Sequence, residues 1–178
     1  HSHKIPAEDL DGQAATIVKR RIRELAREGQ SEFVILPLFL GPSLAISEYL
    51  PQIIGELKEE IPALEVRIAA PLAGQSVETP DQRLAEILGD HVLQSGALGA
   101  SDQVALVDHG TPHRVVNDLR NAVSRQLSEK LGRSVQACSM ERREGPAYAF
   151  NDPLLEDLES SGGAELVRLH LAMFFLLP

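Results

Sequence analysis

The sequence predicts an α/β fold built on parallel sheets. Short apolar runs alternate along the chain with amphipathic stretches of helical period, and glycine or proline marks most of the boundaries. The run "EFVILPLFL" (32–40) is continuously apolar, which is typical of a parallel strand with both faces covered. Because this alternation continues through the chain, we expect helices that flank mostly parallel sheets.

The first half of the chain contains three predicted helices. The stretch 13–29 places its apolar residues on one face and ends at Gly29, which we expect to be its C-cap. A second helix begins near Pro51, because proline is best tolerated in the first turn. A third follows strand 64–72, with Thr79 as N-cap and Pro80 as its first helical residue.

The second half of the chain repeats this alternation after a linker. Residues 95–102, "SGALGASD", are rich in glycine, alanine and serine. After them we expect a strand over 103–108, a helix over 114–131 closed by Gly132, and a strand over 134–140. A short helix near Pro153 and a last strand within 164–178 complete the pattern.

An internal repeat divides the chain into two predicted lobes, 1–98 and 99–178. "HSHKIP" (1–6) and "CSMERR" (138–143) each precede a polar loop, a helix and an apolar strand. Those strands end in "LFLGP" (38–42) and "FFLLP" (174–178). Coincidence among short apolar runs is the alternative. As a repeat, the chain begins inside one lobe and stops inside the other, so we expect a piece of a longer protein.

Composition excludes several classes of function. The net charge is −9 over 178 residues, which disfavours non-specific nucleic-acid binding. Glycine-rich phosphate loops are absent from the sequence, which disfavours nucleotide binding. The sequence contains neither an apolar run long enough to cross a bilayer nor a secretion signal. Cys138 is the only cysteine, which suits the reducing cytoplasm. We therefore expect a cytoplasmic protein, and we expect neither nucleic acid nor a membrane as its partner.

The stretch "VALVDHGTPHRVVNDLR" (104–120) places His109 and His113 where a buried strand ends. Glu141 follows the next strand in the same way. Because the carboxyl ends of parallel strands meet at one edge of a sheet, an imidazole and a carboxylate would come together there. Such a pair suits a divalent first-row metal. A capping or packing role for His109 is the alternative.

Three segments of the chain match the motifs of one known family: "DHGTPHRVVN", "ACSMERREGP" and "ILPLFLGPSLAISEYLP". Together they resemble the class II chelatases, the CbiX and SirB type of sirohydrochlorin cobaltochelatase and ferrochelatase. "DHGTPHRVVN" (108–117) is similar to the family's His-Gly-Ser-Arg…Asn motif at a strand end. "ACSMERREGP" (137–146) is similar to the second strand, which ends in glutamate and is followed by Glu-Pro. "ILPLFLGPSLAISEYLP" (35–51) resembles the Pro-Leu-Phe-Leu-x-x-Gly-x-His-x-x-x-Asp-Ile-Pro segment.

The resemblance implies a three-layer chelatase-like fold with two related lobes. It also implies an enzyme that inserts a metal ion into a tetrapyrrole. It places the metal on His109 and Glu141, with a further histidine three residues after Pro178, and it matches Asn117 to the motif's asparagine, a substrate contact. The metal ion, Co²⁺ or Fe²⁺ with Ni²⁺ also acceptable, is then a substrate, and no organic cofactor is expected.

Departures from the family pattern concentrate in the first lobe. The glutamate position is Lys4, the histidine position of the third strand is Ala45, and Tyr49 replaces the aspartate. We therefore expect the first lobe to be poor in ligands and to serve as a wall of the cleft. In the second lobe, the arginine that follows the His-Gly motif is displaced to Arg114.

Arginines beside the expected ligands are candidates for binding the substrate's carboxylates. Arg114, Arg142 and Arg143 are close in sequence to His109 or Glu141, and arginine can hold a carboxylate with two hydrogen bonds. Solvated loop charges are the alternative reading. His113 is a candidate for relaying protons, whereas we expect His91 and His170 to be packing or surface residues.

The sequence therefore predicts a lyase, a sirohydrochlorin cobaltochelatase or ferrochelatase of cobalamin or siroheme biosynthesis. In it, His109 also assists deprotonation of the pyrroles. A non-catalytic homologue that binds metal or tetrapyrrole is the first alternative, and an α/β interaction module is the second. The sequence leaves a homodimer open.

Overall fold

The computed structural model describes residue 8 and residues 16–161 and 168–176. Contacts divide the chain into two compact units, which we call the first unit (1–37 with 44–69) and the second unit (38–43 with 70–178). These units have other boundaries than the lobes 1–98 and 99–178, which the internal repeat in the sequence predicts. The two lobes stay a prediction. The repeat segment 1–6, with Lys4, and Pro178 lie outside the described residues.

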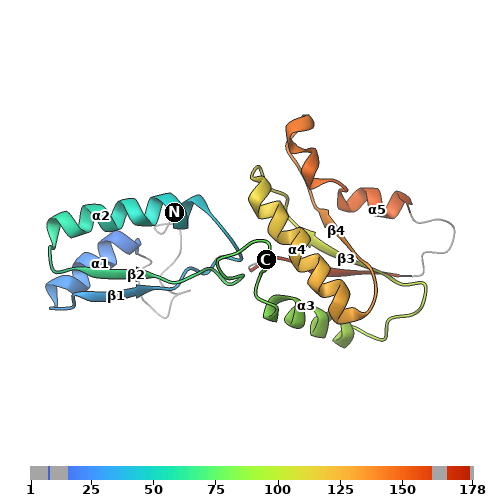
Figure 1. Cartoon of the computed structure of the whole chain (residues 1–178), viewed down its shortest axis with the longest axis horizontal. Coiled ribbons are helices and arrows are strands. Elements are labelled where there is room, and N and C mark those ends of the chain that lie inside the picture. The colour runs from blue at the N-terminus through green and yellow to red at the C-terminus, as the bar shows by residue number, and fades with distance from the viewer. Residues whose placement is uncertain (1–7, 9–15, 162–167, 177–178) are drawn as a thin grey trace. The chain divides into compact units, whose positions relative to one another are not determined.

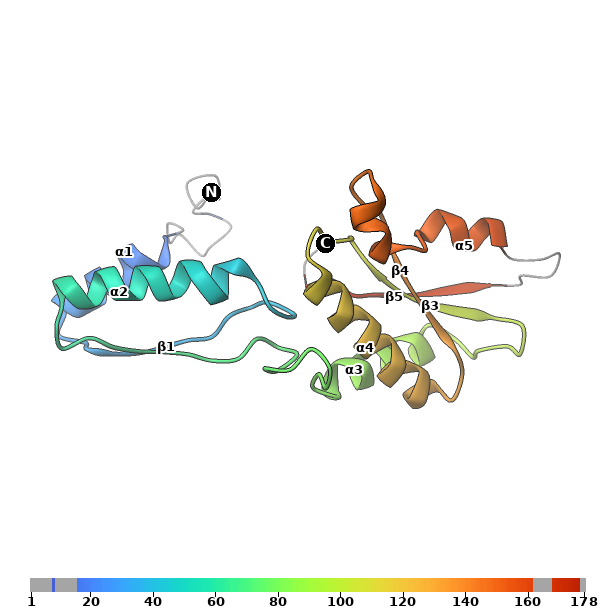
Figure 2. The ribbon, with the colours of Figure 1, turned by 45° about the horizontal axis from the view of Figure 1, so that its top comes forward.

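The first unit is a two-stranded parallel sheet with two helices on the same side of it (Figures 1 and 2). Residues on the helices and in the loop before β2 form its core: Ile22, Ile53, Leu57 and Leu64. In chain order the elements are α1 (Val18–Arg27), β1 (Glu32–Ile35), the π-helical turn η3 (Ala45–Tyr49), α2 (Leu50–Glu60) and β2 (Glu65–Ile68).

Strand β1 differs from the strand predicted over 32–40. It ends at Ile35, and its burial alternates, with Phe33 and Ile35 half-buried and Val34 58% exposed. Only one face of this sheet meets helices, so every second residue faces away from the core. The expectation of a strand covered on both faces is therefore wrong here. Pro37 has no N–H group for a ladder and follows the strand's end.

The helix predicted from about Pro51 is confirmed: α2 begins at Leu50 with Pro51 in its first turn, and the π-helical turn η3 leads directly into it. One helix start differs from the prediction. Helix α3 (Arg83–Gln94) begins after Thr79, and Asp81 Oδ1 accepts the hydrogen bond from the Arg83 amide at 3.0 Å. Asp81 rather than Thr79 therefore satisfies an amide at this helix start, because a carboxylate oxygen accepts from free N–H groups as well as a hydroxyl does.

The second unit has three layers. Its parallel sheet has the strand order β4-β3-β5. Helices α3 and α4 cover one face of this sheet and α5 covers the other (Figure 2). Val104 and Leu106 of β3 pack on the first face, and Ala105 and Val107 pack on the second. The further elements are β3 (Gln103–Asp108), α4 (Arg114–Leu131), β4 (Val135–Ser139), the 3-10 helix η4 (Pro146–Asn151), α5 (Leu155–Ser161) and β5 (Leu169–Met173).

This unit confirms the predicted α/β class with parallel sheets and flanking helices. Gly132 closes α4 with a φ of 62°, as predicted, since glycine adopts the left-handed conformation without strain. The predicted linker 95–102 lies within the second unit, because α3 packs on α4 and β5 (Figure 2). None of the helices in the described part of the chain has the length and apolar character needed to span a membrane.

Candidate metal site

His109 and Glu141 follow adjacent strands of the second unit. The backbones after β3 and β4 continue side by side beyond the strands, where the Met140 amide donates to the Asp108 carbonyl at 2.8 Å. The Glu141 amide then donates to the His109 carbonyl at 3.3 Å. Both side chains are exposed. The fold therefore brings the two predicted ligands to neighbouring positions at one edge of the sheet.

Gly110 makes this close approach of the two loops possible. Its φ is +91°, and a Cβ atom added there would lie 1.9 Å from the Glu141 carbonyl oxygen. A residue with a side chain would be both strained and blocked, so glycine is required. The dipeptide His109-Gly110 thus combines a candidate ligand with the residue that lets the Glu141 loop pack against it.

The imidazole of His109 stacks on the ring of Phe175, which follows β5. Their centroids lie 4.2 Å apart, with an angle of 32° between the planes. A cavity of about 420 Å³ elsewhere in the unit does not include this ring, and neither does a smaller one of about 310 Å³ beside Glu141. Nowhere in the described residues do three or more histidine, cysteine, aspartate or glutamate side chains converge on one point. His109 and Glu141 could thus supply only part of a metal's coordination.

The smaller cavity is lined by charged and backbone groups of the two loops. Its wall combines the carboxylate of Glu141 with two arginines, and it consists of Gly110, Thr111, Pro112, Glu141, Arg142 and Arg143. Arg142 is partly engaged, because its Nε donates to Asp152 Oδ1 at 2.7 Å. The guanidinium of Arg143 lies over the Tyr148 ring, 5.8 Å from its centroid. The two arginines therefore offer positive charge to an anionic group in this cavity.

The remaining predicted substrate contacts lie on α4, outside that cavity. Arg114 lies over the Phe150 ring, 4.8 Å from the centroid. Asn117 is only 1% exposed; its Oδ1 accepts from Asn121 Nδ2 at 3.0 Å, and its Nδ2 has no partner among the described residues. His113 occupies the N-cap position of α4 and is exposed.

Two first-unit positions that the resemblance matches to the family's conserved motif residues, Ala45 and Tyr49, carry no common metal-ligating side chain. Ala45 opens η3, and Tyr49, at its end, is 55% exposed. Neither an alanine nor a tyrosine is a common ligand for a divalent first-row metal. Lys4, the third departure from the family pattern, lies outside the described residues.

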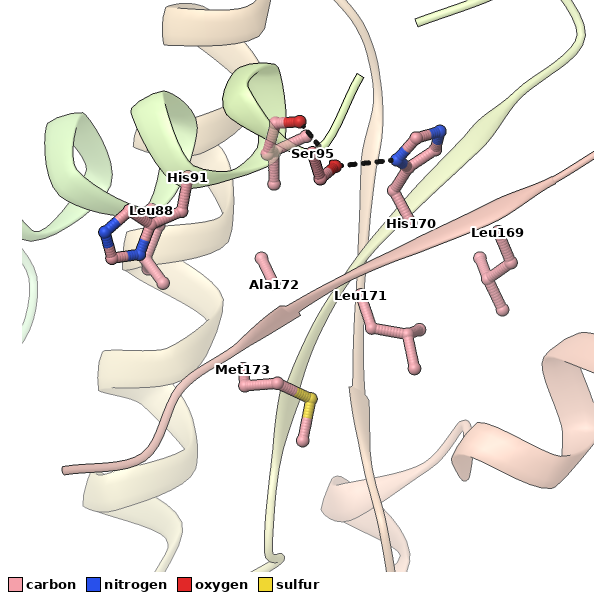
Figure 3. Close-up of a pocket in the computed structure, with 9 residues that line it drawn as sticks. Leu88, His91, Ser95, Leu169, His170, Leu171, Ala172 and Met173 are labelled. Carbon is pink, nitrogen blue, oxygen red and sulfur yellow. Dashed lines mark hydrogen bonds between the residues drawn. The ribbon is translucent and has the colours of Figure 1, made fainter. Parts of the chain in front are cut away.

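A larger cavity, of about 420 Å³, lies between α3 and the edge strand β5 (Figure 3). His170 contacts Ser95 Oγ through Nδ1 at 3.4 Å and Asp102 Oδ2 through Nε2 at 3.2 Å. Arg168 Nη2 also pairs with Asp102 Oδ2, at 2.9 Å. His170 is thus held by polar contacts at the start of β5, more specifically than a packing residue would be. His91 lines the same cavity from α3.

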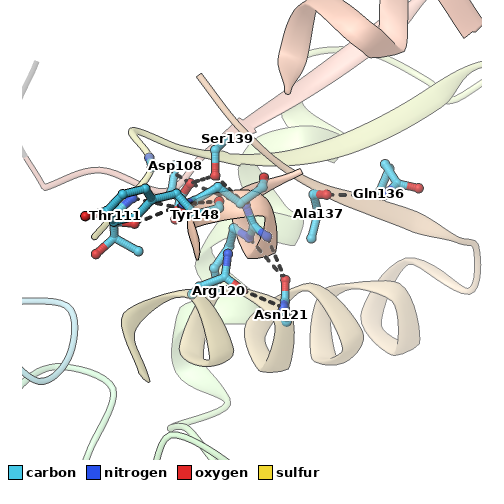
Figure 4. Close-up of polar contacts among 11 residues, drawn as sticks. Asp108, Thr111, Arg120, Asn121, Gln136, Ala137, Ser139 and Tyr148 are labelled. Carbon is cyan, nitrogen blue, oxygen red and sulfur yellow. Dashed lines mark hydrogen bonds and ion pairs between the residues drawn. The ribbon is translucent and has the colours of Figure 1, made fainter. Parts of the chain in front are cut away.

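A buried polar network under the strand ends is the feature that sequence reasoning missed (Figure 4). Asp108 Oδ1 accepts hydrogen bonds from the Gly110 amide at 3.0 Å and from Ser139 Oγ at 2.6 Å. Arg120 Nη1 donates to Ser139 Oγ at 2.5 Å and lies 3.5 Å from Asp108 Oδ1. Burial lowers the pKa of Arg120, and the Asp108 carboxylate opposes that shift. The sequence feature that indicates this network is Arg120, a charged residue next to Leu119 on the apolar side of the predicted helix 114–131.

Comparisons with known proteins agree with this fold. Residues 13–94 match the family model described as CbiX. "SirB from Bacillus subtilis with Fe3+" matches with a TM-score of 0.73 and 13% identity over 94% of this chain and 61% of that one. The sirohydrochlorin chelatase SirB from Bacillus subtilis subspecies spizizenii in complex with cobalt matches with a TM-score of 0.57 and 11% identity, over 89% of this chain and 68% of that one.

At these low sequence identities, the similarity to SirB concerns the fold. Identities of 13% and 11% establish a shared fold, so the predicted chelatase-like fold is confirmed. This chain spans about three fifths of the first of those proteins. A search of curated protein sequences gave no match. The match to the family model ends at residue 94 and so does not include His109 or Glu141.

Proposed function

We propose that this chain, which resembles the class II chelatases both in the sequence of residues 13–94 and in its fold, is part of a tetrapyrrole chelatase. Its substrates would be sirohydrochlorin and a divalent ion, Co²⁺ or Fe²⁺. Both solved structures named above are of SirB, one with Fe3+ and one with cobalt, and this supports a metal substrate of that kind. A cytoplasmic location and a homodimer stay predictions.

One observation carries the proposal: the hydrogen bond of 3.3 Å that joins the His109 carbonyl to the Glu141 amide at the ends of β3 and β4. It holds an imidazole and a carboxylate on neighbouring exposed positions. Histidine and carboxylate suit a first-row divalent ion, and a site with few protein ligands leaves coordination positions for the substrate's nitrogens.

The chemistry requires two protons to leave the tetrapyrrole as the ion enters. Insertion of M²⁺ converts two pyrrole N–H groups into metal–nitrogen bonds and releases two protons. As the ion passes to the ring, the His109 nitrogen that held it would become free to accept one of these protons, and the other would pass to water. The Glu141 carboxylate would balance the charge of the bound ion. The protein's main contribution is to hold ion and ring in register, which makes the encounter a local one.

The carboxylates of the substrate need positive charge beside the metal. Arg142 and Arg143 line the cavity next to Glu141, and we assign them this role. Arg114, the first residue of α4, is a further candidate for binding a carboxylate of the substrate. Asn117 has no part in this proposal, because its side chain is 1% exposed.

The direct test is the visible absorption of sirohydrochlorin during incubation with the full-length protein and Co²⁺. We expect multiple turnovers, and we expect His109→Ala to abolish them. His91→Ala is the matched control, because His91 is an exposed histidine on α3 beside a different cavity. Equal rates for the His109 variant and the wild type would refute the proposal.

A second candidate function is non-catalytic binding of metal or tetrapyrrole. The observation that favours it is that no three metal-ligating side chains converge within the described part of the chain. A binder would shift the spectrum once, in proportion to protein, without turnover. If neither metal nor pigment associates with the protein in equilibrium dialysis, the chain is an interaction module instead.

A further inference from the structure

Arg120 is the largest fully buried side chain among the described residues. It lies in the middle of α4 and is 1% exposed. Removing a guanidinium from water is costly unless hydrogen bonds and an opposite charge compensate for it. Among the described residues, its partners lie at the carboxyl-terminal ends of the strands and in the loops beyond them. Its neighbour Asn121 also accepts through Oδ1, at 3.0–3.1 Å.

One guanidinium thereby joins three segments of chain. It donates to Ser139 Oγ, at the end of β4, at 2.5 Å and to the carbonyl of Asn151, at the end of η4, at 3.4 Å. It also faces the carboxylate of Asp108, at the end of β3, at 3.5 Å. Ser139 closes the triangle, because its hydroxyl donates to the same Asp108 oxygen at 2.6 Å (Figure 4).

Asn151 extends the network to the loop after His109. This side chain is fully buried, and its Oδ1 accepts from the Thr111 amide at 3.0 Å. Its Nδ2 donates to the Thr111 carbonyl at 2.9 Å and to the Tyr148 carbonyl at 3.0 Å. The loop that carries His109 is therefore held at both backbone groups of Thr111.

The predicted ligands lie directly beside this network. His109 follows Asp108, and Glu141 is two residues after Ser139. Replacement of a buried ion pair by apolar side chains is often neutral or stabilising. A gain in stability therefore explains the buried arginine poorly. A role in fixing the spacing of the two loops that carry the predicted ligands explains it better.

We propose that Arg120, acting through Ser139 and Asp108, is a positioning residue that sets the separation of the His109 and Glu141 loops for a divalent cation. This inference rests on the proposed function. Removing a group that hydrogen-bonds to metal ligands and so orients them typically lowers metal affinity about 10- to 100-fold. We expect that range for the loss of this network.

The test measures Co²⁺ binding to the full-length protein by calorimetry and by the visible spectrum of bound Co²⁺. Ser139→Ala removes the hydroxyl that links Arg120 to Asp108 and changes little volume. We expect it to weaken Co²⁺ binding about 10-fold or more and to alter the Co²⁺ spectrum. Arg120→Met should weaken binding further. If that variant fails to fold, as circular dichroism would show, Ser139→Ala carries the test.

Matched controls lie at the other end of the same sheet. Ser124 is a buried serine whose Oγ donates to the carbonyl of Val135, at the start of β4, at 3.0 Å. Arg133 donates to the Gly99 carbonyl at 3.1 Å. We expect Ser124→Ala and Arg133→Ala to leave both Co²⁺ affinity and spectrum unchanged, because neither contacts a strand end that carries a ligand.

The possible results separate this inference from the proposed function. If Ser139→Ala binds Co²⁺ with wild-type affinity and spectrum while His109→Ala loses binding, the positioning role is wrong and the proposed function stands. If His109→Ala and Glu141→Ala both bind Co²⁺ as the wild type does, the proposed metal site is wrong, and the positioning role with it. An equal loss in Ser124→Ala would show a general effect of buried serines and overturn the positioning role.

Discussion

The two sheets of this protein are built from similar apolar segments but are buried differently. In the first unit, β1 and β2 alternate between exposed and half-buried residues, because both helices pack on one face. In the second unit, Val104 to Asp108 of β3 are all buried, because helices pack on both faces. Coverage of one or two faces, rather than the composition of the strand, makes this difference.

The difference extends to the polar groups. Asp108 and Ser139 end strands that are buried on both sides, so their polar atoms must find partners inside the protein, and Arg120 supplies them. In the first unit, the ion pairs lie on the surface of α1 and α2, where Arg23 pairs with Glu60 and Lys19 with Glu56. Exposed pairs contribute little to stability. The doubly covered sheet thus provides rigid strand ends, and the candidate site lies there.

The largest expected effect tests the difference in burial directly. Leu106, in the centre of β3, is fully buried, whereas Val34 of β1 is 58% exposed. We expect Leu106→Ala to lower the free energy of unfolding by about 2–5 kcal/mol and Val34→Ala by less than about 0.5 kcal/mol. Urea unfolding measures both changes. Similar losses from the two variants would contradict the assigned burial of the two sheets.

A pair of glycines sharpens the comparison at the level of single residues. Gly29 and Gly110 both have positive φ, +96° and +91°, but only Gly110 has a neighbour, the Glu141 oxygen, where a Cβ would lie. We expect Gly29→Ala to cost about 1–2 kcal/mol from backbone strain alone. Gly110→Ala should cost more and should also weaken Co²⁺ binding. Unfolding curves and calorimetry together check this, and equal costs would argue against the close approach of the two loops.

The pH dependence of stability has a predicted sign in the second unit. The hydrogen bond from the Gly99 amide lowers the pKa of Asp102, and contacts with His170 and Arg168 lower it further. Desolvation of the carboxylate raises this pKa but does not outweigh these contacts. Because this pKa is lower in the folded protein than in the unfolded chain, where it is near 3.9, ionised Asp102 stabilises the fold at pH values above 3.9. This stabilisation is lost as the pH falls through the pKa of Asp102 in the folded protein. We expect Asp102→Asn to be less stable than wild type at pH 7 and the gap to narrow towards pH 3. A gap independent of pH between these limits would contradict the contacts assigned to Asp102.

The smallest expected effect concerns reactivity rather than stability. Burial raises the pKa of the Cys138 thiol to about 11. At pH 8 only about one such thiol in a thousand is ionised, so a disulfide reagent should react far more slowly with the folded protein than with the unfolded chain. Because Cys138 is the only cysteine in the sequence and lies in the second unit, its labelling rate reports opening of that unit alone. Rapid labelling under native conditions would show that the doubly covered sheet opens easily.

By itself, the sequence determined the α/β class, the strand over 103–108, the helix over 114–131 with its closing Gly132, and the position of His109 and Glu141 after neighbouring strands. These features follow from local periodicity, capping residues and chain order, which neighbouring residues encode. Only the tertiary structure decided which face of β1 is exposed, that Asp81 serves the start of α3, and that Arg120 joins Asp108, Ser139 and Asn151. Those outcomes depend on partners brought together by packing, 31 residues apart in the case of Asp108 and Ser139, and no local pattern records such a pairing.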